Sequence, residues 1–150
     1  APVVVVHAYT RDSIPPGFGF LVPRKEGKRI LGVLFSSNIF EGRKGNLLTI
    51  YLGGATDPQV AEEDDDLISA TVEKELKEIL DVDVNILKIT KWKKAIPQYN
   101  LGYGKFYELA ETLEKEHPGL FLTGNYLRGV SVADCIRNSE EVANRVLEFL

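Results

Sequence analysis

The first half of the chain alternates between short apolar runs and polar turns, a pattern typical of a β-sheet. Residues 3–6 form a continuous β-branched run, which predicts a central strand covered on both faces. Apolar runs at 18–22 and 30–36 flank a charged stretch in which Gly27 suits a turn, so they predict a hairpin. Two further strands are predicted at residues 47–52 and 85–92.

Helical spacing of apolar residues replaces this pattern farther along the chain. The repeat of Ile68, Val72, Leu76 and Ile79 predicts an amphipathic helix over residues 67–80. Residues 56–58, Thr-Asp-Pro, are a helix start signal. The five consecutive carboxylates at 62–66 are expected in solvent at the start of this helix, because neighbouring helical side chains diverge too far to share a metal. Residues 105–117 predict another helix.

The C-terminal stretch predicts a strand, a turn and a helix in succession. Residues 120–122 are an apolar run of strand type, and Gly124 and Gly129 mark the turn that follows. Either Ser131 or Asp134 can cap the final helix. Glycine allows the backbone to approach a ligand, and free amides at a helix start suit electron-rich groups. From the residues alone, a ligand-binding turn and an ordinary strand–turn–helix unit both remain open.

These elements predict an α+β fold, with a mixed, mainly antiparallel sheet and packed helices. The tail from Trp92 onward is expected to contribute one strand and two helices. The chain has 150 residues, 44% of them hydrophobic, which suffices for a core. It begins with Ala1 and contains no methionine, so we expect it to be either part of a longer protein or a processed mature form.

Composition excludes several classes of function. A net charge of -4 gives no electrostatic reason to expect nucleic acid as a partner. No apolar run approaches the roughly 20 residues of a membrane span. The single cysteine, Cys135, excludes an internal disulfide and fits a reducing compartment. No metal-ligand cluster or hydrolytic triad is evident. A cytoplasmic protein is expected, and peripheral contact with a membrane is left open.

Three blocks of the sequence resemble protoporphyrinogen oxidases, which belong to the flavin-dependent amine oxidase superfamily. The first block is Gly-Phe-Gly-Phe-Leu-Val-Pro at 17–23 with Leu-Gly-Val-Leu-Phe-Ser-Ser at 31–37. The second combines Leu-Thr-Ile-Tyr-Leu-Gly-Gly at 48–54 with Trp-Lys-Lys-Ala-Ile-Pro at 92–97. The third is Thr-Gly-Asn-Tyr-Leu-Arg-Gly-Val-Ser-Val-Ala-Asp-Cys-Ile at 123–136. Together the blocks follow the family's order and span nearly the whole chain.

The resemblance implies an oxygen-dependent FAD flavoenzyme of haem and porphyrin biosynthesis. Its substrate would be protoporphyrinogen IX, oxidised to protoporphyrin IX. The substrate-binding residues carried over are Leu21, Leu34 and Tyr51, and Tyr51 stands where relatives often have phenylalanine. The FAD-binding residues carried over are Trp92, Gly124, Asn125, Val130, Ser131 and Val132. No catalytic residue and no metal ligand is assigned.

The resemblance also implies that the chain is the C-terminal third of an enzyme. The family's G-x-G-x-x-G dinucleotide fingerprint is absent, as is the basic residue that holds a propionate from the N-terminal side. Residues 1–90 would belong to the substrate-binding domain and residues 91–150 to the FAD-binding domain. The expected partners are a porphyrinogen and the remainder of the parent chain, with a homodimer left open. We expect the isolated chain to lack oxidase activity and to bind FAD weakly or not at all.

Three alternatives remain open at this point. A coproporphyrinogen-oxidising relative would share most of these motifs. Another FAD-dependent amine oxidase or desaturase would act on amines or carotenoids, and an amine oxidase should favour aromatic residues beside the flavin. A standalone porphyrin-binding module would keep the pocket without the redox chemistry.

Overall fold

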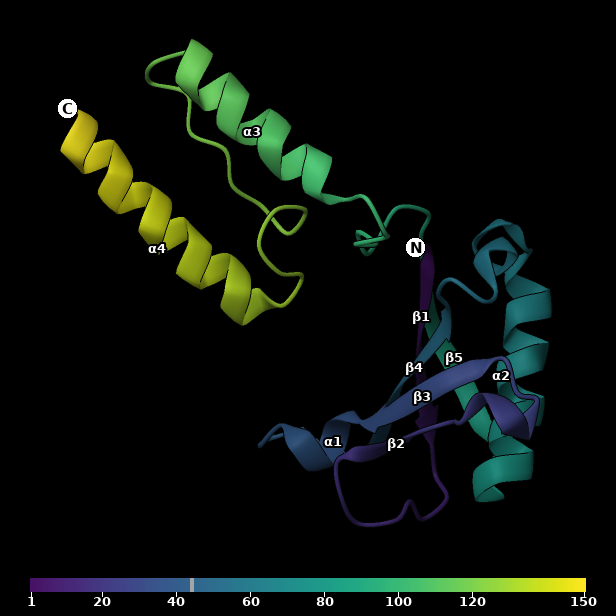
Figure 1. The fold of residues 1–150 in the computed structure, drawn as a ribbon. Coiled ribbons are helices and arrows are strands. Elements are labelled where there is room, and N and C mark those ends of the chain that lie inside the picture. Colours follow the sequence, from purple (N-terminus) through teal and green to yellow (C-terminus); the bar gives the residue numbers. More distant parts are fainter. Residues whose placement is uncertain (44) are drawn as a thin grey trace. The chain divides into compact units, whose positions relative to one another are not determined.

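The computed structural model describes residues 1–43 and 45–150, which form two compact units, residues 1–95 and 96–150. Lys44, between the predicted strands at 30–36 and 47–52, lies outside the described residues. The first unit contains a five-stranded sheet, and the second contains two long helices (Figure 1).

The sheet has the strand order β2-β3-β4-β1-β5, and every pairing is antiparallel. Its strands are β1 (Val3–Thr10), β2 (Gly19–Leu21), β3 (Ile30–Phe35), β4 (Asn46–Gly53) and β5 (Val84–Trp92). The predicted hairpin corresponds to β2 and β3, and Gly27 has the positive φ of 65° expected of a turn glycine. The α+β class is thus confirmed.

Short helices connect the strands before the long helix of this unit. The short ones are the 3₁₀ turns η1 (Arg24–Glu26) and η2 (Pro58–Glu62) and the one-turn α1 (Ser36–Ile39). The long helix is α2 (Asp65–Leu80). The start signal at 56–58 therefore begins a separate 3₁₀ turn, and α2 itself begins after Asp64. The predicted helix is confirmed, and it ends where Asp81 adopts a left-handed conformation.

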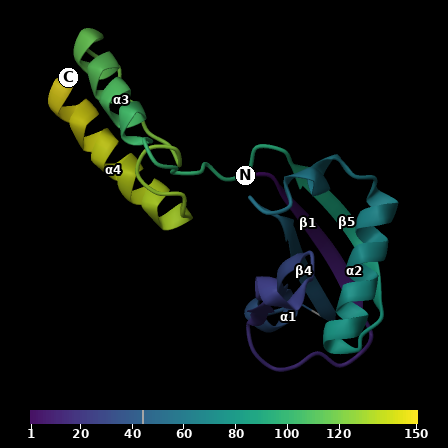
Figure 2. The same ribbon diagram turned by 45° about the vertical axis from the view of Figure 1, so that its right-hand side comes forward.

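Helix α2 covers one face of the sheet (Figures 1 and 2). Its Ile68, Val72 and Leu76 are fully buried against the sheet. The facing core residues include Val4, Val6 and Ala8 of β1, Val33 and Phe35 of β3, and Leu48, Ile50 and Leu52 of β4.

Strand β1 is central but buried on one face only. Val3, Val5 and Tyr9 are half-buried and His7 is exposed, in alternation with the buried positions. The expectation of a strand covered on both faces is therefore wrong for this unit. A run of valines gives no alternation of its own, so it cannot distinguish a doubly covered strand from one with an apolar open face.

The second unit consists of α3 (Gly104–Glu116) and α4 (Val132–Phe149), joined by residues 117–131. In both ribbon views the two helices run in the same direction, and the connection returns beside them (Figures 1 and 2). It must travel the length of α3, about 20 Å at 1.5 Å per residue.

This return explains why the predicted strand at 120–122 is wrong. The segment is not assigned as a strand, and no described strand pairs with it. The backbone N–H of Leu122 donates instead to the Glu114 carboxylate at 2.7 Å. An apolar run long enough for a strand can equally be a connection packed between helices.

A buried carboxylate fixes α2 to the edge of β3. Glu75 is 7% exposed and accepts hydrogen bonds from the backbone N–H groups of Arg29 and Ile30, at 2.9 to 3.0 Å. The Arg29 side chain in turn donates to Glu63 and Asp57, at 2.8 to 3.0 Å. These contacts raise the pKa of Arg29, chiefly through the hydrogen bonds to Glu63. The helix therefore cannot slide along the sheet without leaving buried donors unpaired.

We expect Glu75→Ala to lower the free energy of unfolding by about 2 kcal/mol, because two backbone donors lose their acceptor. Glu73 lies on the exposed side of the same helix, so Glu73→Ala is the matched control. It should change stability by less than about 0.5 kcal/mol. Urea unfolding followed by circular dichroism measures both, and equal effects would contradict the assigned role of Glu75.

Candidate functional site

The predicted substrate residues come from β2, β3 and β4 and lie on one face of the sheet. This outer face is the face opposite α2, because directly paired residues share a face and successive residues alternate. Its strand positions are Val3, Val5, His7, Tyr9, Gly19, Leu21, Gly32, Leu34, Leu47, Thr49, Tyr51, Gly53, Asn85, Lys88, Thr90 and Trp92. The register thus brings Leu21, Leu34 and Tyr51 together.

One row across the outer face is largely apolar. Tyr51 pairs with Val5 on one side and with Gly32 on the other, and Gly32 pairs with Leu21. A Cβ at Gly32 would lie 2.9 Å from Leu21 Cδ2 and 2.7 Å from the Phe20 carbonyl oxygen. The Leu21 side chain therefore lies over Gly32, next to Tyr51. Close packing between strands accounts for the glycine at this position.

Trp92 extends the same face at its β5 edge. It pairs with Val3, which pairs with Gly53. Trp92 is 56% exposed and Leu21 is 85% exposed, while Leu34 and Tyr51 are half-buried. Large apolar side chains that gather on an exposed face indicate a binding surface.

A second row, parallel to the first, is polar. Lys88, His7, Thr49 and Leu34 follow one another across β5, β1, β4 and β3. His7 Nδ1 and Thr49 Oγ1 are 3.1 Å apart, and Thr49 Oγ1 lies 2.8 Å from Ser36 Oγ. Neither His7 nor Thr49 was predicted from the sequence to have a role in the site. The two-residue period that places Tyr51 on this face also includes Thr49, so alternation was the available signal.

The predicted flavin-binding turn lies in the second unit and is held by two tyrosines. Tyr99 donates its hydroxyl to the Asn125 carbonyl at 2.6 Å and accepts the N–H of Gly129 at 3.0 Å. Tyr103 donates to the Tyr126 carbonyl at 2.8 Å. This supporting role of the two tyrosines was not predicted from the sequence, because each tyrosine is far in sequence from the residues that it contacts.

The start of α4 presents the remaining predicted FAD contacts. Ser131 is its N-cap and accepts the N–H of Asp134 at 3.0 Å, which selects one of the two predicted caps. Val130 and Val132 are 47% and 77% exposed. Together with Asn125 they line a shallow hollow. The glycine at 129 is required by the chain itself, since a Cβ there would lie 2.6 Å from the Asp134 carboxylate.

The charge at this helix start indicates which part of FAD would fit. Asp134 Oδ2 accepts the Ser131 hydroxyl at 2.6 Å, which places a negative charge at the positive end of α4. A second anion, such as the FAD pyrophosphate, would be repelled. The exposed apolar side chains of Val130 and Val132 suit an uncharged group at this position better than an anion.

In residues 1–43 and 45–150, no group of three or more His, Cys, Asp or Glu side chains could hold a metal ion. Within the same residues, no helix has the length and apolar character needed to cross a membrane.

An ion pair joins the two helices of the second unit. Glu114 on α3 accepts the N–H of Leu122 and pairs with Arg145 on α4. The hydrogen bond from Arg145, followed by that from Leu122, lowers the pKa of Glu114 below its ordinary 4.5. This pair fixes the connection that leads into the candidate FAD-binding turn.

Comparison with known proteins adds family relationships to this geometry. The family model described as flavin containing amine oxidoreductase matches residues 1–147. The chain is also similar to a crystal structure from Exiguobacterium sp. 255-15, provisionally named a protoporphyrinogen oxidase. The TM-score is 0.78 at 19% identity, over 98% of this chain and 34% of that one, which shows a shared fold.

Curated relatives match nearly the whole chain. Protoporphyrinogen oxidase 1, chloroplastic, of Spinacia oleracea is 35% identical over 93% of this chain and 26% of its own length. Protoporphyrinogen oxidase 2, chloroplastic/mitochondrial, of Arabidopsis thaliana is 30% identical over 98% of this chain and 31% of its own. Coproporphyrinogen III oxidase of Bacillus subtilis is 28% identical over 89% of this chain and 30% of its own length. The chain therefore spans about a quarter to a third of these relatives.

The lowered pKa of Glu114 predicts a pH-dependent stability of the second unit. The stabilisation is fully present above pH 4.5 and is lost as the pH falls through the lower folded-state pKa. At neutral pH the unmodified chain should melt at a higher temperature than Glu114→Gln. We expect this difference in melting temperature to shrink as the pH is lowered to about 3.

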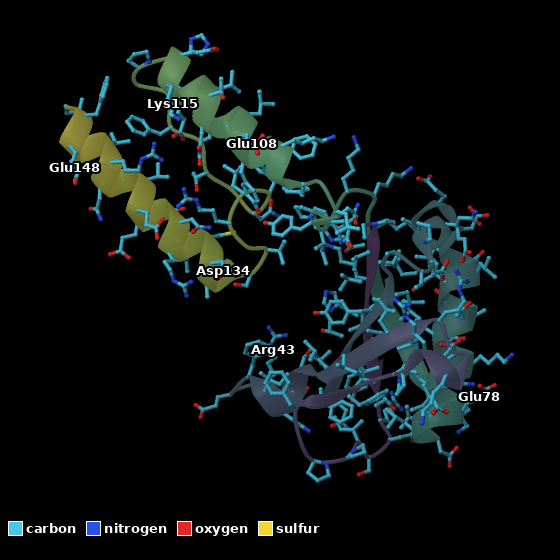
Figure 3. The ribbon with its side chains drawn as sticks, in the orientation of Figure 1. Arg43, Glu78, Glu108, Lys115, Asp134 and Glu148 are labelled. Atoms are coloured by element: carbon cyan, nitrogen blue, oxygen red, sulfur yellow. The ribbon has the colours of Figure 1, made fainter. Side chains whose placement is uncertain are left out.

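Glu108→Gln, at an exposed position of the same helix labelled in Figure 3, is the control and should show no such trend. Helical circular dichroism during heating measures all three proteins. A constant difference between the unmodified chain and Glu114→Gln across this pH range would contradict the prediction.

Proposed function

Because the chain belongs to the flavin containing amine oxidoreductase family, we propose that it is the C-terminal part of an FAD-dependent oxidase acting on a porphyrinogen. The proposed reaction is oxidation of protoporphyrinogen IX to protoporphyrin IX. The curated relatives from Spinacia oleracea and Arabidopsis thaliana support this choice, at 35% and 30% identity. The chain covers only 26% and 31% of the lengths of these two relatives, which supports the proposal that it works together with the remainder of a longer parent protein.

The observation that carries the proposal is the group of large apolar side chains on neighbouring rows of the outer face. Leu21, Leu34 and Tyr51 were assigned to the substrate from resemblance, and antiparallel register gathers them from β2, β3 and β4. Aliphatic and aromatic side chains on a flat sheet suit a large, flat ligand with an apolar centre. The proposed role of this face is to bind and orient the tetrapyrrole.

The turn at 124–129 and the start of α4 are proposed to contact FAD, together with Trp92. When bound, FAD supplies the redox chemistry, accepting hydrogen removed from the porphyrinogen before oxygen reoxidises it. The chain's own contribution is the set of amides at Val130 to Val132, held in position by Tyr99 and by the Ser131 cap. Residues 1–90 are proposed to belong to the substrate-binding domain and residues 91–150 to the FAD-binding domain. The observed division at 95–96 supports a boundary in this region.

Oxidation of coproporphyrinogen is the second candidate, and a specific observation favours keeping it. The Bacillus subtilis relative, named coproporphyrinogen III oxidase, is 28% identical over 89% of this chain. Anaerobic mixing of the intact parent protein with each porphyrinogen would distinguish the two, because only a substrate should bleach the flavin absorption. An absence of bleaching with both porphyrinogens would contradict the proposed oxidase.

The isolated chain should not retain FAD, because it lacks the dinucleotide fingerprint that holds the phosphates. Gel filtration after incubation with excess FAD should yield protein without flavin absorption, and the protein should not oxidise protoporphyrinogen. The intact parent protein, treated identically, is the positive control. A flavin spectrum and turnover from residues 1–150 alone would contradict this expectation.

The outer face should bind protoporphyrin IX, the stable product of the proposed reaction. Trp92 is the one tryptophan of the sequence and lies on that face, so its fluorescence should be quenched in a saturable manner. Tyr51→Asp and Leu34→Asp should each weaken binding by about tenfold or more, because a charge then faces the apolar ring.

Leu67→Asp is the matched control for this experiment. Leu67 is 51% exposed on α2, which covers the opposite face of the sheet, so its substitution should leave binding unchanged. Equal weakening by all three substitutions, or an absence of saturable quenching, would contradict the assignment of the outer face.

A further inference from the structure

The polar row of the outer face places two basic side chains beside the apolar row. Lys88 of β5 pairs directly with His7 of β1, and His7 pairs directly with Thr49 of β4. Side chains of directly paired residues have Cβ atoms roughly 5 Å apart. The row lies two residues along each strand from the row of Tyr51, which is about 7 Å. One ligand of moderate size can therefore contact both rows.

Hydrogen bonding leaves donors of this row available. His7 Nδ1 is engaged with Thr49 Oγ1, which fixes the ring, and the described residues provide no partner for its other nitrogen. Lys88 likewise has no carboxylate partner among the residues that the structure describes. By contrast, the two lysines that follow Lys88 most closely in the sequence are paired: Lys91 with Asp65 and Lys93 with Glu62. An unpaired lysine next to a fixed imidazole is a site suited to a carboxylate.

Charge on the outer face differs from charge on the whole chain. The sequence contains 22 acidic residues and has a net charge of -4, yet none of the outer-face strand positions is Asp or Glu. Arg43 adds a further cation, since it lines a hollow with His7 and Thr49. Figure 3 shows Arg43 beside α1, on the opposite side of the sheet from Glu78 of α2. Its guanidinium lies 4.9 Å from the centre of the Phe40 ring.

We propose that Lys88 and His7, with His7 fixed by Thr49, form a subsite for a carboxylate of the tetrapyrrole. This proposal rests on the proposed function, because it requires the ring to lie on the adjacent apolar row. A porphyrinogen carries propionate side chains at the edge of its ring. With the ring against Leu21 and Tyr51, one propionate reaches Lys88 and His7. The subsite orients the ligand on the face, and no bond is formed or broken there.

The test compares protoporphyrin IX with its dimethyl ester, in which both carboxylates are blocked. Binding to residues 1–150 is followed through Trp92 fluorescence. Lys88→Ala and His7→Ala should each weaken binding of the free acid by about threefold to tenfold, the range expected of exposed charged contacts. Neither substitution should alter binding of the ester.

Lys74→Ala is the matched control, because it removes one positive charge from the exposed side of α2 and should leave both ligands unaffected. Equal weakening by Lys74→Ala would mean that long-range charge, and not the subsite, attracts the porphyrin. If Lys88→Ala changes the binding of neither the free acid nor the ester, the subsite is overturned and the proposed function remains intact. Failure of both ligands to bind would overturn the subsite and the porphyrin-binding face together.

Discussion

The alternation of side chains along the antiparallel strands is the constraint on which the site depends. Val4, Val6 and Ala8 of β1 must face α2 to build a core, and this commits Val3, Val5 and His7 to the other face. A shift of register by one residue would reverse both sets at once. The outer face is therefore specified by the same packing that stabilises the first unit.

Stability and site geometry are linked through β3. Glu75 fixes the start of β3 against α2, and β3 carries Gly32 and Leu34 between Leu21 and Tyr51. The missing side chain at Gly32 lets Leu21 cover the strand and lie beside Tyr51. In the second unit, Tyr99 has the corresponding role, because one hydroxyl fixes both ends of the 125–129 turn.

Local pattern was sufficient to predict much of the fold from the sequence. Periodicity located α2, the cap residues located the start of the final helix, and the turn at Gly27 indicated the hairpin. It was not sufficient at residues 120–122, where strand formation depends on a neighbouring strand that the described chain lacks. Burial of Glu75 was equally hidden, since an acid within an amphipathic helix is normally exposed.

The candidate site shows the same division. Resemblance named Leu21, Leu34 and Tyr51, but only the strand register shows that they share a face. His7 and Thr49 were missed because their connection spans 42 residues of sequence. Predicting such a contact requires knowledge of which strands are neighbours, and that follows from the tertiary fold.

The most direct test of the central claim is NMR mapping of protoporphyrin IX on isotopically labelled chain. The aromatic ring current of the porphyrin shifts nearby resonances strongly, so the signals report which face the ligand covers. We expect shifts at Leu34, Thr49 and Tyr51 and little change at Ile68 and Val72, which belong to α2 and face the sheet from its other side. Shifts centred on α2, or an absence of shifts on the outer face, would contradict the proposed binding face.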